Sequence, residues 1–302
     1  MQRIIPLAAL TILAAGPLAG QEIVGRADKA FSLNEAIKAG GWVRVATFNG
    51  RIDITTGGSQ VEIRAVKEVH RGEIEDIGFV VRREQDGLTI CAVYEDRDEC
   101  DEDGGYRGVG RSRDWSRHHQ GQVDFTVQVP AGTRVKAGSG NGELRIEGAG
   151  ADVIAATGNG RVNIAGSSGE VRVSTGNGEV TVQDAQGPVD VSTGSGAIHV
   201  VTSTGPVSAN SGNGDIDVSI GKLDRLPDMT FSTGNGEVRL TLPPGLGAEL
   251  DANTGNGHVT TDFPVTLKSG RLDPSRLRGR IGDGGGRLSI SSGNGDIEIR
   301  KQ

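Results

Sequence analysis

The densest reactive chemistry in the sequence lies in a charged segment between Tyr94 and Gln120. Its acidic half contains Glu95, Asp96, Asp98, Glu99, Asp101, Glu102 and Asp103, and its basic half contains Arg107, Arg111, Arg113, Arg117, His118 and His119. Tyr94, Tyr106 and Trp115 lie among these charges. Clustered carboxylates supply the oxygen ligands that calcium prefers, and aromatic side chains beside arginines are typical of binding contacts.

Three interpretations of this segment stay open. We favour a solvated loop whose acidic and basic halves neutralise one another. The second is a contact site for a protein or a glycan, and the third is a calcium site, although the spacing does not match a D-x-D-x-D-G loop. The candidate binding residues are Tyr94, Glu95, Asp96, Asp98, Asp101, Asp103, Tyr106, Arg107, Arg111 and Trp115. We assign no metal ligand.

Cys91 and Cys100 are the only cysteines. In an oxidising compartment an isolated pair this close in sequence is most simply a disulfide, which would clip the base of the charged segment. A metal pair is the weaker alternative, because no His lies at ligand spacing beside either cysteine.

Recognisable catalytic motifs are missing from the sequence. It contains no Gly-Lys-Ser/Thr phosphate loop, no dinucleotide fingerprint and no Gly-x-Ser-x-Gly elbow. His199 and His258 stand alone at outward strand positions, and the repeated Ser and Thr read as turn and outward residues. A polysaccharide-degrading β-helix would need carboxylates beside aromatics, but residues 141–221 contain no Trp, Tyr or Phe. We therefore expect no enzyme and no cofactor.

A nine-residue repeat runs nine times from Asn141 to Gly221. The fourth and sixth residues of every unit are apolar, as in Val180 and Val182, whereas the fifth residue is polar in all units but one. This alternation predicts short strands with one buried face. Gly at the second position of almost every unit predicts a turn before each strand.

Alternate units differ, so the true period is eighteen residues. Every second unit opens with an asparagine, except that Ser195 takes one place; these residues are Asn141, Asn159, Asn177 and Asn213. A unit of two strands cannot bury its own apolar face, so we expect each strand to pair with its equivalent one coil away. A meander of hairpins is the alternative, since Asn-Gly also favours hairpin turns. Stacked coils explain the repeated asparagines better, as a ladder of amide hydrogen bonds.

The predicted fold is therefore all-β, a parallel β-solenoid (β-helix) of about 18-residue coils, each with two short strands, and with short capping turns. Ser32-Leu-Asn-Glu35 has the spacing of a helix capping box, and Asp273-Pro274 reads as the start of another short helical turn. Residues 222–231 and 265–285 depart from the repeat and read as surface excursions.

Three segments carry a resemblance to a known family. They are Ser174 to Val182, Gly41 to Gly50 and Ser292 to Ile299, all built on the Asn-Gly turn. They resemble the bacterial putative adhesin domains of unknown function and are similar to the head-GIN type of exported β-solenoid. The resemblance covers residues from about 40 to 302. The resemblance implies a β-solenoid architecture, and it identifies no catalytic residue in this chain.

The first twenty residues read as a secretory signal peptide, with Arg3, an apolar run and small residues before Gln21. The expected organisation is a signal peptide (1–20), an N-terminal lead-in with a cap (21–40) and a single solenoid domain (41–302) with the charged excursion at 94–120. No transmembrane segment is expected after signal removal. The net charge of −7 makes nucleic acid a poor partner.

These observations favour a non-catalytic exported protein, adhesin-like or a scaffold of the cell envelope, located in the periplasm or at the cell surface. Its expected partner is an envelope protein or a glycan, and self-association through the solenoid ends is open. The alternative is a β-helical enzyme that acts on envelope or extracellular polysaccharide.

Overall fold

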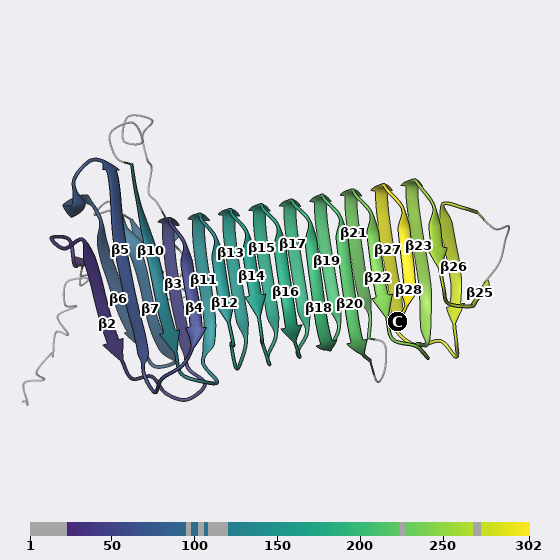
Figure 1. Ribbon diagram of the computed structural model, residues 1–302, viewed down its shortest axis with the longest axis horizontal. Coiled ribbons are helices and arrows are strands. Elements are labelled where there is room, and N and C mark those ends of the chain that lie inside the picture. The colour runs from purple at the N-terminus through teal and green to yellow at the C-terminus, as the bar shows by residue number, and fades with distance from the viewer. Residues whose placement is uncertain (1–22, 95–97, 102–105, 108–119, 224–226, 268–272) are drawn as a thin grey trace, which may run out of the picture.

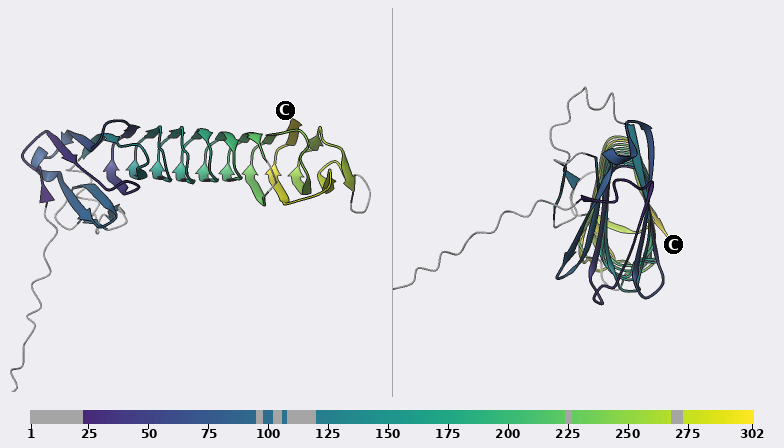
Figure 2. Two further views of the ribbon diagram at one scale, coloured as in Figure 1. Left: turned by 90° about the horizontal axis from the view of Figure 1, so that it is seen from below. Right: turned by 90° about the vertical axis from the view of Figure 1, so that its left-hand side faces the viewer.

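The structure is a computed structural model that describes residues 23–94, 98–101, 106–107, 120–223, 227–267 and 273–302. Two long sheets face each other and form an elongated rod (Figure 1). The signal-peptide prediction for residues 1–20 lies outside the described residues. Seen along the rod, the sheets are the broad sides of a flattened tube (Figure 2).

Sheet A contains fourteen strands. In spatial order they are β1 (Ile23–Val24), β6 (Gly78–Glu84), β7 (Gly87–Val93), β3 (Trp42–Asn49), β11 (Arg134–Asn141), β13 (Val153–Asn159), β15 (Val171–Asn177), β17 (Val189–Ser195), β19 (Val207–Asn213), β21 (Met229–Asn235), β27 (Arg287–Asn294), β23 (Ala248–Asn256), β26 (Arg276–Ile281) and β25 (Val265–Leu267).

Sheet B contains twelve strands. In spatial order they are β2 (Ala30–Glu35), β5 (Val61–Arg71), β10 (Gln120–Val129), β4 (Ile52–Thr56), β12 (Leu144–Glu147), β14 (Val162–Ala165), β16 (Val180–Ala185), β18 (Ile198–Thr204), β20 (Ile216–Lys222), β22 (Val238–Leu242), β28 (Ile297–Lys301) and β24 (Val259–Thr261). A small third sheet pairs β8 (Glu99–Cys100) with β9 (Tyr106–Arg107), and η1 (Ile74–Asp76) is a 3-10 turn.

The repeat folds into stacked coils, each with one strand in sheet A and the next in sheet B. Val171 of β15 lies opposite Val153 in the preceding coil and Val189 in the following coil, and both pairings are parallel. The repeat positions predicted to be inward are buried; Val180 and Val182 both have 0% exposure. The prediction of an all-β parallel solenoid is confirmed.

Each repeat strand of sheet A buries a third position, and here the sequence interpretation needs a correction. One row of Ser and Thr faces inward, because these strands run two residues beyond the predicted apolar pair. The row consists of Ser139, Thr157, Thr175, Thr193, Ser211, Thr233, Ser292 and Thr254. Each hydroxyl donates to a glycine carbonyl at a turn, as Thr233 does to Gly214 over 2.9 Å. The hydroxyls thus satisfy acceptors inside the rod.

The N-terminal end of the rod is built from antiparallel strands, and the prediction of a short helix that starts with the capping pattern Ser32 to Glu35 is wrong. Those residues lie in β2, which pairs antiparallel with β5. The half-buried Phe31 and Leu33 alternate with exposed residues, so strand pairing and apolar burial override the local capping pattern. Phe31 stacks on Phe79 with 4.8 Å between ring centroids. Aromatic rings therefore fill this wider end.

The helical turn predicted at Asp273-Pro274 is also absent from the structure. The Asp273 carboxylate instead accepts hydrogen bonds from the backbone N–H of Ser275 (2.9 Å) and from its hydroxyl (2.8 Å). This tight turn leads directly into β26, which begins at Arg276 and pairs antiparallel with β23. The side chain that would cap a helix here closes a turn between strands.

Near the C-terminus the spatial order of the coils departs from the chain order. The last coil, β27 and β28, lies between the coil of β21 and β22 and the coil of β23 and β24 (Figure 1, yellow among green). Asn294 of β27 is therefore opposite both Asn235 and Asn256. The expectation that coils stack in chain order fails here because all three coils carry the same Gly-Asn-Gly turn, so the local sequence does not specify the neighbour.

Candidate functional site

The charged segment is fastened to the rod by a disulfide and a buried carboxylate. Cys91 of β7 is bonded to Cys100 of β8, which confirms the disulfide prediction. The Asp98 side chain is 1% exposed, and its Oδ2 accepts the backbone N–H of Tyr94 over 2.8 Å. Of the candidate binding residues, Asp98 is therefore placed in the base of the segment, and Asp101 is half-buried.

The side chain of Tyr94, one of the candidate binding residues, is buried. Its side chain is 4% exposed, and its hydroxyl donates to the backbone oxygen of Asn49 over 2.9 Å. The ring packs edge to face against Phe48, with 6.2 Å between centroids. Tyr94 thus anchors the start of the segment to β3. The predictions for Glu95, Asp96, Asp103, Arg111 and Trp115, and for the side chains of Tyr106 and Arg107, lie outside the described residues.

A pocket of about 530 Å³ opens beside this anchor, at the end of β3 where the antiparallel strands meet the coils. Its apolar lining is half-buried or buried and consists of Phe48, Val69, Ile77 and Tyr94. Its polar lining consists of Asn49, His70, Arg71, Glu73, Asp76, Gln120, Gln122 and Asn141, with Gly121 between the glutamines. Tyr94 and Gln120, the first and last residues of the charged segment, both line this pocket.

The charges of the pocket nearly cancel. Arg71 contributes one positive charge, and Glu73 and Asp76 contribute two negative charges. The Asp76 carboxylate also accepts the backbone N–H of Glu73 over 2.8 Å and so stabilises the turn before η1. The pocket therefore offers no strong field of either sign to a ligand.

The asparagines predicted to form a ladder lie in one row along the edge of the rod. The side-chain nitrogen of Asn159 donates to Oδ1 of Asn141, and that of Asn177 donates to Oδ1 of Asn159, both over 2.8 Å. Asn141 donates in the same way to Asn49, the last residue of β3. Beyond Ser195 the row continues through Asn213, Asn235, Asn294 and Asn256. The row thus starts at the pocket and follows the whole series of coils.

The turns that carry this row require glycine. Gly178 has φ +155°, and a Cβ there would overlap the carbonyl oxygen of Gly160 in the preceding coil. Close stacking of the turns explains why Gly follows the asparagine in each of these coils.

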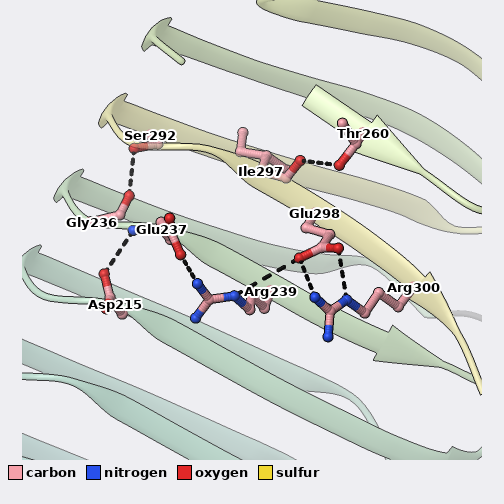
Figure 3. Close-up of polar contacts among 9 residues, drawn as sticks. All are labelled: Asp215, Gly236, Glu237, Arg239, Thr260, Ser292, Ile297, Glu298 and Arg300. Atoms are coloured by element: carbon pink, nitrogen blue, oxygen red, sulfur yellow. Dashed lines mark hydrogen bonds and ion pairs between the residues drawn. The ribbon is translucent and has the colours of Figure 1, made fainter. Parts of the chain in front are cut away.

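The outward faces of the sheets carry paired charges. Arg145 contacts Glu147 over 2.6 Å, Arg172 contacts Glu170 over 2.7 Å, and His199 lies 3.9 Å from Asp217. Around the last coil, Arg239 contacts Glu237 and Glu298, and Arg300 contacts Glu298 (Figure 3). A shallow depression of about 240 Å³ lies there, lined by Glu237, Arg239, His258, Thr260, Asp296 and Glu298. Such exposed pairs contribute little stability each.

Two features are absent from the described ranges of the chain. No three His, Cys, Asp or Glu side chains gather there in a group able to hold a metal ion. Within the same ranges, no helix has the length and hydropathy needed to cross a membrane.

Sequence comparison identifies one family. The profile described as Toastrack DUF4097 matches residues 100–300, which confirms the resemblance inferred from the repeated motifs. No curated protein sequence matches the chain.

Several solved structures are similar in architecture. A putative adhesin of Bacteroides fragilis NCTC 9343 is 14% identical, with a TM-score of 0.45 over 92% of this chain and 99% of that one. A putative adhesin of Parabacteroides distasonis ATCC 8503 is 11% identical, with a TM-score of 0.42 over 90% of this chain and 98% of that one. A putative cell adhesion protein of Clostridium sporogenes ATCC 15579 is 12% identical, with a TM-score of 0.27 over 91% and 100% of the two chains.

Proposed function

Because the chain belongs to the Toastrack DUF4097 family, whose profile matches residues 100–300, we propose that it is a non-catalytic, adhesin-like binding protein of the cell envelope. One observation carries this proposal. The stacked coils form a rod with a pocket of about 530 Å³ near one end, beside the base of the charged segment. A rigid frame that holds a binding site at its end is suited to presenting that site to a partner.

Export is part of the proposal, with the periplasm or the cell surface as the location. The disulfide between Cys91 and Cys100 supports it, because such bonds persist in oxidising compartments. The predicted signal peptide at residues 1–20 supports it independently.

Carboxylates in the pocket and on the outer face of sheet B already have partners within the protein. This favours a binding protein over a polysaccharide-degrading enzyme. In the pocket, Asp76 serves as an acceptor within its own turn. On the outer face of sheet B, Glu237 and Glu298 are ion-paired with arginines (Figure 3). A glycosidase instead needs one protonated and one ionised carboxyl group facing a shared substrate.

Fractionation of cells tests the proposal. The full chain, with its own leader and a C-terminal tag, is expressed in a bacterial host, and the intact mass of the protein is measured in each fraction. We expect a product that begins near Gln21, contains the disulfide and sediments with isolated envelopes. An uncleaved, reduced protein in the cytoplasm would contradict export. Failure of the purified mature protein to bind envelopes would contradict the binding role.

A further inference from the structure

The strands that line the pocket lie inside their sheets. β3 lies between β7 and β11, β5 between β2 and β10, β10 between β5 and β4, and β11 between β3 and β13. On one side the pairing stops short of the pocket, since β2 pairs with β5 only as far as Val66 and β7 pairs with β3 only as far as Ala46. The lining side chains are the groups that the pocket presents to a small ligand.

Two of these side chains are amides held in fixed positions. Asn49 donates to the carbonyl oxygen of Gly121 over 3.3 Å and accepts a bond from Asn141 over 2.8 Å. Asn141 in turn accepts a bond from Asn159. Each amide carries two N–H groups, and these bonds use one of them. Because the ladder already orders both side chains, a ligand that binds the remaining N–H groups costs little conformational entropy.

Apolar side chains line the pocket beside these amides. Phe48 is half-buried, and its ring is fixed edge-on against Tyr94. Val69 and Ile77 extend this apolar lining. A ligand that fits must therefore present an apolar face and, next to it, groups that hydrogen-bond to planar amides. A sugar ring has both, since its C–H bonds form one face and its hydroxyls lie around the edge.

The charge and the volume of the pocket limit the class of ligand that it can bind. The small net charge of Arg71, Glu73 and Asp76 disfavours a strongly acidic or basic ligand. The volume of about 530 Å³ lies within the range of about 300–1,000 Å³ that is usual for small-molecule sites. We propose that this pocket binds a short, uncharged oligosaccharide. The inference rests on the proposed binding function and names its ligand class.

The test uses the mature full-length protein and a panel of neutral oligosaccharides built from hexoses and N-acetylhexosamines. Parallel panels contain uronate- or sialate-bearing oligosaccharides and random peptides. We expect at least one neutral oligosaccharide to bind, with a dissociation constant of about 1 mM or tighter by calorimetry. The other panels should bind at least about tenfold more weakly, a difference of about 1.4 kcal/mol.

Two matched variants locate the site. Asn141→Ala and Asn177→Ala each remove one amide from the ladder, but only Asn141 lines the pocket. Asn141→Ala should weaken binding about tenfold, as expected for a lost hydrogen bond, and Asn177→Ala should leave it within about twofold. His70→Trp, at an exposed position, should block the pocket without affecting the core.

The inference is overturned if the folded protein binds no neutral oligosaccharide, if it prefers the charged glycans or the peptides, or if the two asparagine variants weaken binding equally. Envelope binding by the wild-type protein keeps the two proposals apart. If the wild type binds envelopes but no neutral oligosaccharide, the oligosaccharide pocket is wrong and the envelope-binding role stands.

Discussion

The side-chain nitrogen of Asn177 donates to Oδ1 of Asn159 over 2.8 Å, and the coil that follows places Ser195 opposite Asn177. Ser195 also lies opposite Asn213 on its other side. A serine carries no amide and is too short to replace one. The row of asparagines is therefore divided at Ser195 into two shorter ladders.

Restoring the missing amide should stabilise the rod. In Ser195→Asn the new side chain faces an acceptor on Asn177 and a donor on Asn213, so up to two hydrogen bonds form at an exposed edge. We expect the free energy of unfolding to rise by about 0.5–1.5 kcal/mol in urea titrations. Ser174→Asn, also exposed but opposite Ala156 and Ser192, is the control and should have little effect. Equal effects of the two substitutions would contradict the ladder.

A charge introduced on the inside of the coils should reduce stability far more than a charge introduced on the outside. Val180 is 0% exposed, whereas the neighbouring Thr181 is half-buried on the outward face. Val180→Asp places a carboxylate without a partner in the narrow core and should cost about 3 kcal/mol or more. Thr181→Asp should change the unfolding midpoint only slightly. A similar loss in both variants would show that the assignment of faces is wrong.

The inward hydroxyls should matter for stability. Thr233→Val keeps the shape of the side chain but removes the donor to the carbonyl oxygen of Gly214. We expect a loss of about 1–2 kcal/mol, because the buried acceptor loses its partner. Thr230→Val, at an exposed position of the same strand, is the control. Thermal denaturation of both variants is the measurement. If Thr233→Val unfolds at the same temperature as the wild type, the inward hydroxyls do not contribute to stability.

Lys67 should make stability depend on pH. Its ammonium is buried at the N-terminal end and donates to the carbonyl oxygens of Gly25 (2.7 Å) and Arg26 (2.9 Å). Burial lowers the pKa of Lys67 from 10.5 to about 8. Between these values the unfolded chain holds the proton that the folded chain has released, so this group makes the free energy of unfolding rise as the pH increases.

The variant Lys67→Met isolates that contribution. It should be less stable than the wild type at pH 7, because the carbonyl oxygens lose their donor. Urea titrations at several pH values between about 7 and 10 should show a smaller rise of stability with pH in the variant. Parallel curves for the two proteins would mean that the pKa of Lys67 is not lowered.

Much of the rod could be predicted from the sequence, because the nine-residue pattern occurs nine times and each copy specifies its own strand and turn. The apolar residue at the fourth position of each unit, such as Val180, fixes the buried face, and the Asn-Gly turn fixes the coil length. The third inward position was missed because Thr and Ser do not signal burial. Only the geometry of the turn shows that the hydroxyl of Thr233 has an acceptor inside the rod.

The ends and the pocket could be predicted less well, since they depend on contacts distant in sequence. Ser32 to Glu35 forms a strand because β5 pairs with it, and β5 begins at Val61. Tyr94 was selected as a candidate binding residue, and its burial could not be deduced because its partner Asn49 lies 45 residues away. The pocket combines residues from Phe48 to Asn141, and its lining follows no spacing that a sequence pattern reports.

The interior position of the last coil makes the end of the chain a connector within the rod. β27 pairs with β21 across 59 residues, as in the bond between Asn294 and Asn235, whereas neighbouring repeat coils are 18 residues apart. In sheet A, β23 meets the earlier coils only through β27, and in sheet B, β24 meets them only through β28. A rod stacked in chain order would lose only its tip if its last coil were removed. Here removal of residues 287–302 would also remove the strands that join the coil of β23 and β24 to the rest of the rod.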